Sequence, residues 1–195
     1  MDLGRNMPKH GPLIICRSLT LLRIMERAAP GVTFRLAKGS DIEYVADCFV
    51  RTMREKEHAE GLAPQADDVV RKGIRCYLDP QTRTGILSRL LGKTGSPSSE
   101  LFIGIDEKEE RVGCFVLRLR PDEGVSTAWI YLVFVEPDHR RKGVGTAMMV
   151  KAEEWALANG AISITLNVWP SNLDALHLYE RTGYETEKIW MVKKL

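Results

Sequence analysis

The spacing of apolar residues predicts helices in the first half of this chain and mainly strands further on. Residues 32–36 alternate between apolar and polar side chains, which predicts a half-buried strand. In the two segments that follow, apolar residues recur every three or four positions, as on the buried face of a helix. The first helix is expected over residues 41–57, where Ser40 and Glu43 match a capping box, and the second over residues 69–77.

Residues 81–99 show no clear spacing of apolar residues that would predict a helix or a strand. From residue 100 the spacing of apolar residues becomes typical of strands. Two strand-like segments separated by a charged turn predict an antiparallel hairpin, and a third segment predicts a more buried strand. The expected elements are strands 101–105, 112–119 and 127–135, helix 143–159, strand 162–168, helix 172–181 and strand 184–195. Their order predicts a mixed α/β or α+β domain, with a sheet flanked by helices.

The regular patterning begins at residue 32, so we expect a single domain over residues 32–195 after an N-terminal extension of residues 1–31. The extension contains short apolar runs, but Arg17 and Arg23 interrupt them, which argues against a secretory signal. An additional helix, a disordered leader and an overlong start with Met25 as a later initiator remain alternatives. No function is assigned to this extension.

Composition narrows the class of protein further. The chain has 195 residues, and its 28 Lys and Arg against 26 Asp and Glu give a net charge of +2, which offers no argument for a nucleic-acid partner. No stretch approaches the roughly 20 apolar residues that span a membrane, so no membrane partner is expected. The cysteines lie far apart, match no zinc-binding spacing, and are interpreted as reduced thiols of a cytoplasmic protein; they are Cys16, Cys48, Cys76 and Cys114.

The most informative segment, residues 133–146, joins a buried strand to a helix through a loop with two glycines. The first N–H groups of a helix have no partner within it, and glycines let a ligand approach the backbone closely. Basic side chains precede the helix, so the segment fits a phosphate site, although a basic turn before an ordinary helix is the alternative. Walker and Rossmann loops are excluded, because Thr146 directly follows Gly145 and Met148 stands where a third glycine is needed.

A second segment of interest, residues 166–184, contains a turn followed by a short helix. Ser171 or Asn172 is expected to cap this helix, and Ala175 and Tyr179 then lie one turn apart on the same face. The small side chain of Ala175 leaves room for a ligand. Taken alone, Tyr179 is more typical of a packed amphipathic side chain than of a catalytic group.

Together the two segments resemble the GNAT superfamily of N-acetyltransferases. The resemblance rests on an Arg-x-x-Gly-x-Gly pattern at residues 140–145, an Asn-x-x-Ala-x-x-x-Tyr pattern at residues 172–179, and Gly183 followed by Tyr184. It covers residues 32–195 and is strongest from residue 127 onward. It implies a mixed, mostly antiparallel central sheet flanked by helices, in which a splayed pair of strands binds acyl-CoA.

The cofactor implied by this resemblance is acetyl-CoA. Its pyrophosphate is expected at the loop before the predicted helix 143–159, mostly on backbone N–H groups, and its pantetheine arm along the backbone of the strand before that loop. The cofactor contacts that follow are Val133, Phe134, Val135, Arg140, Arg141, Lys142, Gly143, Val144, Gly145, Thr146, Asn172, Ala175 and Tyr179. No metal is expected.

The implied reaction is direct transfer of the acetyl group to a primary amine in a ternary complex. Tyr179 suits protonation of the leaving thiolate, and a free N–H near Val133 suits stabilisation of the oxyanion. Deprotonation of the amine has no clear residue, because Trp129 occupies the strand position where many relatives have Glu. Glu136 is the candidate base, with a solvated carboxylate as its alternative interpretation. A non-catalytic acyl-CoA-binding regulatory module is the alternative function.

The acceptor is expected to be a small-molecule or protein amine, but the sequence does not identify it. Acidic residues in the early helices could attract a cationic amine, or could form a solvated face of mixed charge with the interleaved Arg51, Arg54 and Lys56. These acidic residues are Glu55, Glu57, Glu60, Asp67 and Asp68. Trp129, Trp169 and Trp190 are expected either to line the acceptor pocket or to lie in the core. An exposed final strand could support a homodimer.

Overall fold

The computed structural model describes residues 29, 31–78, 99–122, 125–191 and 193. The predicted N-terminal extension, apart from Ala29 and Gly31, and all but the last residue of the undecided segment 81–99 lie outside these residues.

The order of helices and strands follows the prediction closely. Every predicted element except the last strand is present. The ends of each of these elements lie within three residues of the predicted ends. The elements are β1 (Thr33–Leu36), the 3-10 turn η1 (Gly39–Asp41), α2 (Ile42–Ala59), α3 (Asp67–Leu78), β2 (Ser99–Ile105), β3 (Arg111–Asp122), β4 (Val125–Val135), the 3-10 turn η2 (Pro137–His139), α5 (Val144–Ala158), β5 (Ala161–Leu166) and α6 (Leu173–Arg181).

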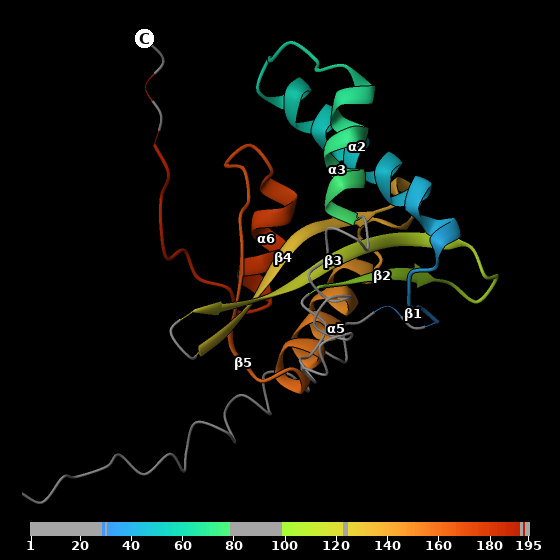
Figure 1. Ribbon diagram of the computed structural model, residues 1–195, viewed down its shortest axis with the longest axis vertical. Coiled ribbons are helices and arrows are strands. Elements are labelled where there is room, and N and C mark those ends of the chain that lie inside the picture. The colour runs from blue at the N-terminus through green and yellow to red at the C-terminus, as the bar shows by residue number, and fades with distance from the viewer. Residues whose placement is uncertain (1–28, 30, 79–98, 123–124, 192, 194–195) are drawn as a thin grey trace, which may run out of the picture.

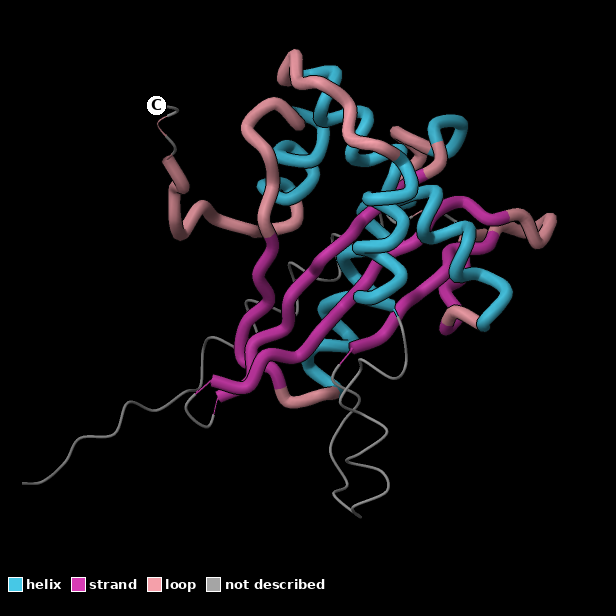
Figure 2. Tube along the Cα trace, turned by 45° about the horizontal axis from the view of Figure 1, so that its top comes forward, coloured by secondary structure: helices cyan, strands magenta, loops and turns pink. Residues whose placement is uncertain are grey.

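Five strands form one sheet in the order β1-β2-β3-β4-β5 (Figure 2). Neighbouring strands are antiparallel except β4 and β5, which are parallel and joined by the crossover helix α5. The predicted fold class, a mixed and mostly antiparallel sheet flanked by helices, is therefore confirmed.

Helices cover both faces of this sheet, and each face has its own core (Figure 1). On one face Met148 and Trp155 of α5 pack with Phe115, whose ring stacks on that of Phe102 at a centroid distance of 4.9 Å. On the other face Val45 of α2 belongs to a second buried cluster with residues of β2, β3 and β4. Each such side chain contributes about 1.5–3 kcal/mol when it is fully buried, so α2 and α5 are held firmly against the sheet.

The predicted last strand at residues 184–195 is wrong over its described part. Residues 184–191 have no regular secondary structure, and Trp190 is 94% exposed. Aromatic and β-branched residues such as Tyr184 and Ile189 suit a strand, but a strand forms only when a neighbour satisfies its N–H and C=O groups. Among the described residues this segment has no such neighbour, and β5 is the edge of the sheet.

The predicted capping box at Ser40 is also wrong. The N-cap of α2 is Asp41, and η1 precedes the helix. The carboxylate of Asp41 accepts the N–H of Lys38 at 2.8 Å and binds Arg35 and Arg111. These contacts hold Asp41 at the N-cap of α2, one residue later than the Ser40 cap that the sequence pattern predicts.

None of the helices in the described part of the chain is long and apolar enough to cross a membrane.

Candidate active site

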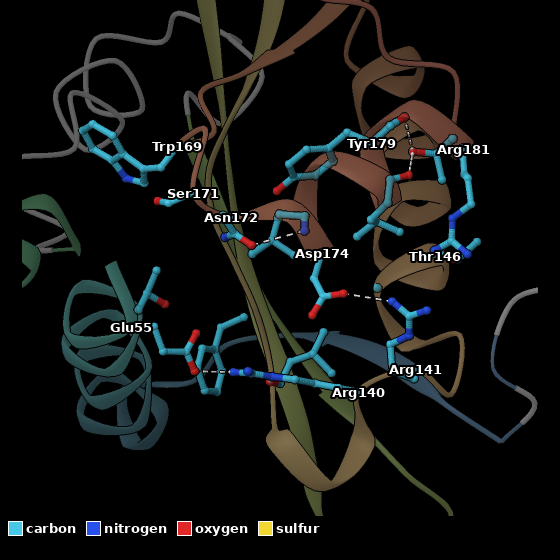
Figure 3. Close-up of a pocket in the computed structure, with 18 of the residues that line it drawn as sticks. Glu55, Arg140, Arg141, Thr146, Trp169, Ser171, Asn172, Asp174, Tyr179 and Arg181 are labelled. Atoms are coloured by element: carbon cyan, nitrogen blue, oxygen red, sulfur yellow. Dashed lines mark hydrogen bonds and ion pairs between the residues drawn. The ribbon is translucent and has the colours of Figure 1, made fainter. Parts of the chain in front are cut away.

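A cavity of about 740 Å³ lies where four segments far apart in the sequence meet (Figure 3). Its walls are the last two turns of α2, the end of β4, the loop before α5, and the segment from Trp169 to Thr182 that contains α6. The volume falls within the range of about 300–1,000 Å³ that is usual for sites of small molecules and cofactors.

One wall of the cavity is the last part of β4, whose edge beyond Ile130 pairs with no other described strand. The pairing of β4 with β5 ends at Ile130, five residues before β4 itself ends. The Glu136 N–H donates to Val112 of β3 at 2.9 Å, and peptide groups alternate along a strand, so those of Val133 and Val135 point away from β3. Accordingly, the Val135 carbonyl accepts a bond from the Arg140 side chain at 3.1 Å. The predicted splay is present, and its open edge faces the cavity.

The start of α5 forms a second wall. Gly143 precedes the helix with a φ of 84°, a left-handed conformation that suits glycine, and Arg141 has a φ of 63°. The first backbone hydrogen bond of the helix runs from Ala147 to Gly143 at 3.0 Å. The N–H groups of the three residues between them make no hydrogen bond to any other residue that the structure describes. Three donors at the positive end of a helix therefore remain available to an anion.

The charges around the cavity also suit an anion. The lining includes four basic side chains and two acidic ones, which are Lys56, Arg140, Arg141, Arg181, Glu55 and Asp174. Arg140 pairs with Glu55 at 2.6 Å and Arg141 with Asp174 at 2.9 Å (Figure 3). Such exposed pairs contribute only about 0–1 kcal/mol each, so a polyanionic ligand can replace the carboxylates.

Tyr179 projects into the cavity from α6 (Figure 3). The helix is capped by Asn172, whose side-chain oxygen accepts the Ala175 N–H at 3.2 Å, as expected for one of the two predicted caps. Burial raises the pKa of Tyr179 to about 12, so its phenol keeps its proton at neutral pH. Tyr184 lies beside it at a ring-centroid distance of 5.7 Å, and its own hydroxyl is buried without a partner among the described residues.

Most predicted cofactor residues lie together around this cavity. Those that line it are Val133, Phe134, Val135, Arg140, Arg141, Gly143, Gly145, Thr146, Asn172, Ala175 and Tyr179. Lys142 is exposed outside the lining, and the Val144 side chain is buried in the core, so Val144 offers only its N–H group. The contacts of these residues with a cofactor stay predictions.

Glu136, the predicted base, does not line the cavity. Its carboxylate accepts hydrogen bonds from the Tyr44 hydroxyl at 3.0 Å and from the Arg51 guanidinium at 3.2 and 2.9 Å. The carboxylate is therefore bound by two side chains of α2 and is not free in solvent as the alternative interpretation held. A role as base stays an untested prediction.

Sequence reasoning did not assign α2 to the cofactor wall. Thr52, Glu55, Lys56 and Ala59 line the cavity, and the Lys56 ammonium lies 3.5 Å from the ring centroid of Trp169. The alternating acidic and basic residues of α2 indicated that this helix could contact a charged ligand. The sequence did not reveal which side of the helix faces the open edge of β4. Of the three tryptophans considered for an acceptor pocket, Trp169 lines the cavity, while Trp190 lies in neither pocket nor core.

These features form a cavity in which an open strand edge and the start of a helix offer backbone groups to an anionic ligand. The class of protein follows from the comparison with known proteins: residues 68–184 match the acetyltransferase (GNAT) family, and the chain belongs to this family. The predicted superfamily is thus confirmed, and the family supports the predicted enzyme class, an acyltransferase.

Relatives and solved structures agree with this assignment. An uncharacterized N-acetyltransferase of Methanocaldococcus jannaschii is 38% identical over 73 residues, which cover 35% of this chain and 32% of that protein. The uncharacterized N-acetyltransferase YycN of Bacillus subtilis is 29% identical over 60% of this chain and 74% of its own length. The YycN structure matches 84% of this chain and 98% of its own with a TM-score of 0.64 at 20% identity, which shows a shared fold.

A further solved structure with this fold is AAC(6')-Iy in complex with a bisubstrate analog, CoA-S-monomethyl-acetylneamine. It covers 84% of this chain and 98% of its own, with a TM-score of 0.54 and 14% identity.

Proposed function

We propose that this chain is an N-acetyltransferase that moves an acetyl group from acetyl-CoA to a primary amine by direct transfer in a ternary complex. The observation that carries the proposal is the continuity of two sets of unpaired backbone groups, at the start of α5 and along the end of β4, with Tyr179 opposite them. Cytoplasm is the proposed location, since Cys48 and Cys114 are free, buried thiols.

The residues present fit acetyl-CoA. The N–H groups of Val144, Gly145 and Thr146 and the side chains of Arg140 and Arg141 would hold the diphosphate. The open edge of β4 at Val133 and Val135 would pair with the amides of the pantetheine arm, as an added strand does. When bound, acetyl-CoA supplies the acetyl thioester on which the amine acts.

Two groups of the chain would then serve the reaction. The Val133 N–H, pointing away from β3, would donate a hydrogen bond to the carbonyl oxygen as that oxygen gains negative charge. Tyr179 would hold its proton at Oη and donate a hydrogen bond to the leaving sulfur. Because thiols have a reference pKa of about 8.5 and the pKa of Tyr179 is raised to about 12, Tyr179 would stabilise the thiolate without giving up its proton completely.

The test is Tyr179→Phe, with Tyr184→Phe as the matched control. Thiol release from acetyl-CoA is measured with a panel of primary amines, and acetyl-CoA affinity by calorimetry. We expect Tyr179→Phe to lower kcat about 10²-fold with little change in affinity, because the hydrogen bond acts on the departing sulfur. Tyr184→Phe should change neither, since its hydroxyl is buried without a described partner and lies outside the cavity lining.

Two outcomes would contradict the proposal. Full activity of Tyr179→Phe would remove Tyr179 from the mechanism. Tight binding of acetyl-CoA with no turnover of any amine would favour the alternative function, a non-catalytic acyl-CoA-binding module.

A further inference from the structure

The cavity-lining residues of α6 lie in two rows along the helix. Asp174, Leu178 and Arg181 follow one another at intervals of four and three residues, which places them in one row, the Leu178 row. Ala175 and Tyr179 are four residues apart and lie in the neighbouring row. Since the second row carries the hydroxyl proposed to face the leaving sulfur, the Leu178 row is left for another part of the cofactor.

The Leu178 row lies against the start of α5. At one end of the row, Asp174 pairs with Arg141 at 2.9 Å. In its middle, a Cβ atom placed on Gly145 would lie 2.9 Å from the Leu178 side chain, so the two helices approach each other closely here. Arg181 follows Leu178 by three residues, about 4.5 Å along the helix axis. Arg181 is thus about one turn away from the residue that contacts the proposed diphosphate site.

The side chain of Arg181 is directed towards the start of α5. Its Nε donates a hydrogen bond to the His177 carbonyl at 3.1 Å, which holds the guanidinium back along α6, towards the turn that contains Leu178. Figure 3 shows Arg181 on the same side of the cavity as Thr146 and Arg141. The bond to His177 uses Nε, so the two terminal nitrogens can donate to a ligand in parallel.

The other basic side chains of the cavity lining already have a position or a proposed role. Arg140 and Arg141 are proposed to hold the diphosphate, and the Lys56 ammonium lies over the ring of Trp169 at 3.5 Å from its centroid. Arg181 is the remaining basic residue of the lining. It offers a positive charge beside the diphosphate site for a further anionic group of the same ligand.

Coenzyme A carries such a group, a phosphate on the 3′ oxygen of its ribose. The diphosphate is attached to the 5′ oxygen of the same ribose, and the C5′, C4′ and C3′ carbons alone separate the two oxygens. A cation one helical turn from the diphosphate site therefore suits the 3′-phosphate. A phosphate monoester has a charge of about −1.5 to −2 at neutral pH, and a guanidinium binds it through two parallel N–H bonds.

We infer that Arg181 binds the 3′-phosphate of the cofactor and makes this chain prefer coenzyme A to its dephosphorylated form. This inference rests on the proposed acetyl-CoA-dependent function. The 3′-phosphate takes no part in the chemistry, so the contact stabilises the bound substrate and the transition state equally. Arg181 therefore acts on cofactor affinity and not on the rate of acetyl transfer.

The experiment compares CoA with dephospho-CoA, which differ by the 3′-phosphate alone. Calorimetric titration of the wild-type chain at low ionic strength should show CoA bound about tenfold more tightly, because charge-assisted hydrogen bonds form. In Arg181→Gln the two affinities should differ by about twofold or less. With acetyl-CoA as substrate, the same variant should raise KM and leave kcat unchanged.

Lys151→Gln is the matched control for charge loss, since Lys151 lies on α5 and pairs with Glu154. It should keep the wild-type preference for CoA. Arg181→Lys keeps the charge without the planar fork, so its preference should lie between those of the wild type and Arg181→Gln. Thermal unfolding of Arg181→Gln should match the wild type, because the hydrogen bond from Arg181 to His177 is exposed to solvent.

The outcomes separate this inference from the function on which it rests. Equal affinity of the wild type for CoA and dephospho-CoA would overturn a 3′-phosphate site while acetyl transfer stands. An unchanged preference in Arg181→Gln, or an equal loss of preference in Lys151→Gln, would overturn the assignment to Arg181. Failure of the wild type to bind either compound would overturn the proposed function and this inference together.

Discussion

Asp41 shows how a single buried carboxylate can join the first strand, the first helix and the middle of the sheet. Its side chain is fully buried, and Arg35 of β1 and Arg111 of β3 bind it at 2.7 and 2.9 Å. The hydrogen bonds from Arg35 are the main reason that the pKa of Asp41 is held well below its usual range. The charged form of Asp41 is therefore favoured by folding.

We expect Asp41→Asn to lower the free energy of unfolding by about 2 kcal/mol at pH 7, because charge-assisted hydrogen bonds are lost. A depressed carboxyl pKa contributes stability above the unfolded pKa of about 3.9, and this contribution disappears as the pH falls towards the folded pKa. The difference between wild type and variant should therefore be constant from pH 8 to pH 5 and shrink below about pH 4. Urea unfolding across this range measures it.

Asp138→Asn provides the control for this prediction. Asp138 is exposed and makes no ion pair within the described ranges, so the variant should unfold like the wild type. A loss of stability in Asp41→Asn that persists unchanged to pH 3 would contradict a role for the charge.

At the scale of the element, the start of α5 is the feature on which the cofactor site depends. We expect Gly143→Ala to lose about 1 kcal/mol of stability, since alanine is strained at a φ of 84°. It should also weaken acetyl-CoA binding, because relief of that strain moves the N–H groups that follow. Calorimetric titration and thermal unfolding measure the two effects separately.

Gly160→Ala at the other end of α5 distinguishes strain from site geometry. Gly160 has a φ of 74°, and nothing lies within 4 Å of an added Cβ, so the loss of stability should be similar. Its cofactor affinity should equal that of the wild type. If Gly143→Ala also binds like the wild type, the start of α5 does not hold the diphosphate.

Elements with a local signal could be predicted from the sequence, and their tertiary partners could not. The apolar spacing of α5 and the short apolar runs of β2 and β3 report burial directly, so these elements were predicted to within three residues. Residues 184–191 include strand-favouring side chains such as Tyr184, Ile189 and Trp190, yet strand formation depends on a neighbour that the sequence does not specify. For the same reason the glycines at the start of α5 were assigned to the cofactor site in advance, whereas Glu55 and Lys56, which reach the site only through packing of α2, were not.

At the scale of the whole molecule, helices cover both faces of the sheet, and β1 and β5 are its two edge strands within the described residues. The outer edge of β5 has no partner strand among the described residues, and Ile162 on that strand is 68% exposed. Near the end of the chain, Ile189, Trp190 and Met191 are 82%, 94% and 88% exposed, and Figure 1 shows this segment leading away from the helices. Unpaired strand edges and contiguous exposed apolar groups both favour association.

The chain therefore carries both halves of an interface, a strand edge with no partner among the described residues and a segment with strand-favouring apolar side chains, and two copies can satisfy both by reciprocal exchange. We expect a concentration-dependent dimer, measured by light scattering after size exclusion, and a shift to monomer in Trp190→Glu, because a charge replaces the most exposed apolar side chain of the segment. Leu157→Glu on α5, where Leu157 is 63% exposed, is the matched control and should leave the dimer intact. A wild-type chain that stays monomeric at all concentrations, with the amides of residues 185–191 protected from hydrogen exchange, would show that the segment pairs within its own chain instead.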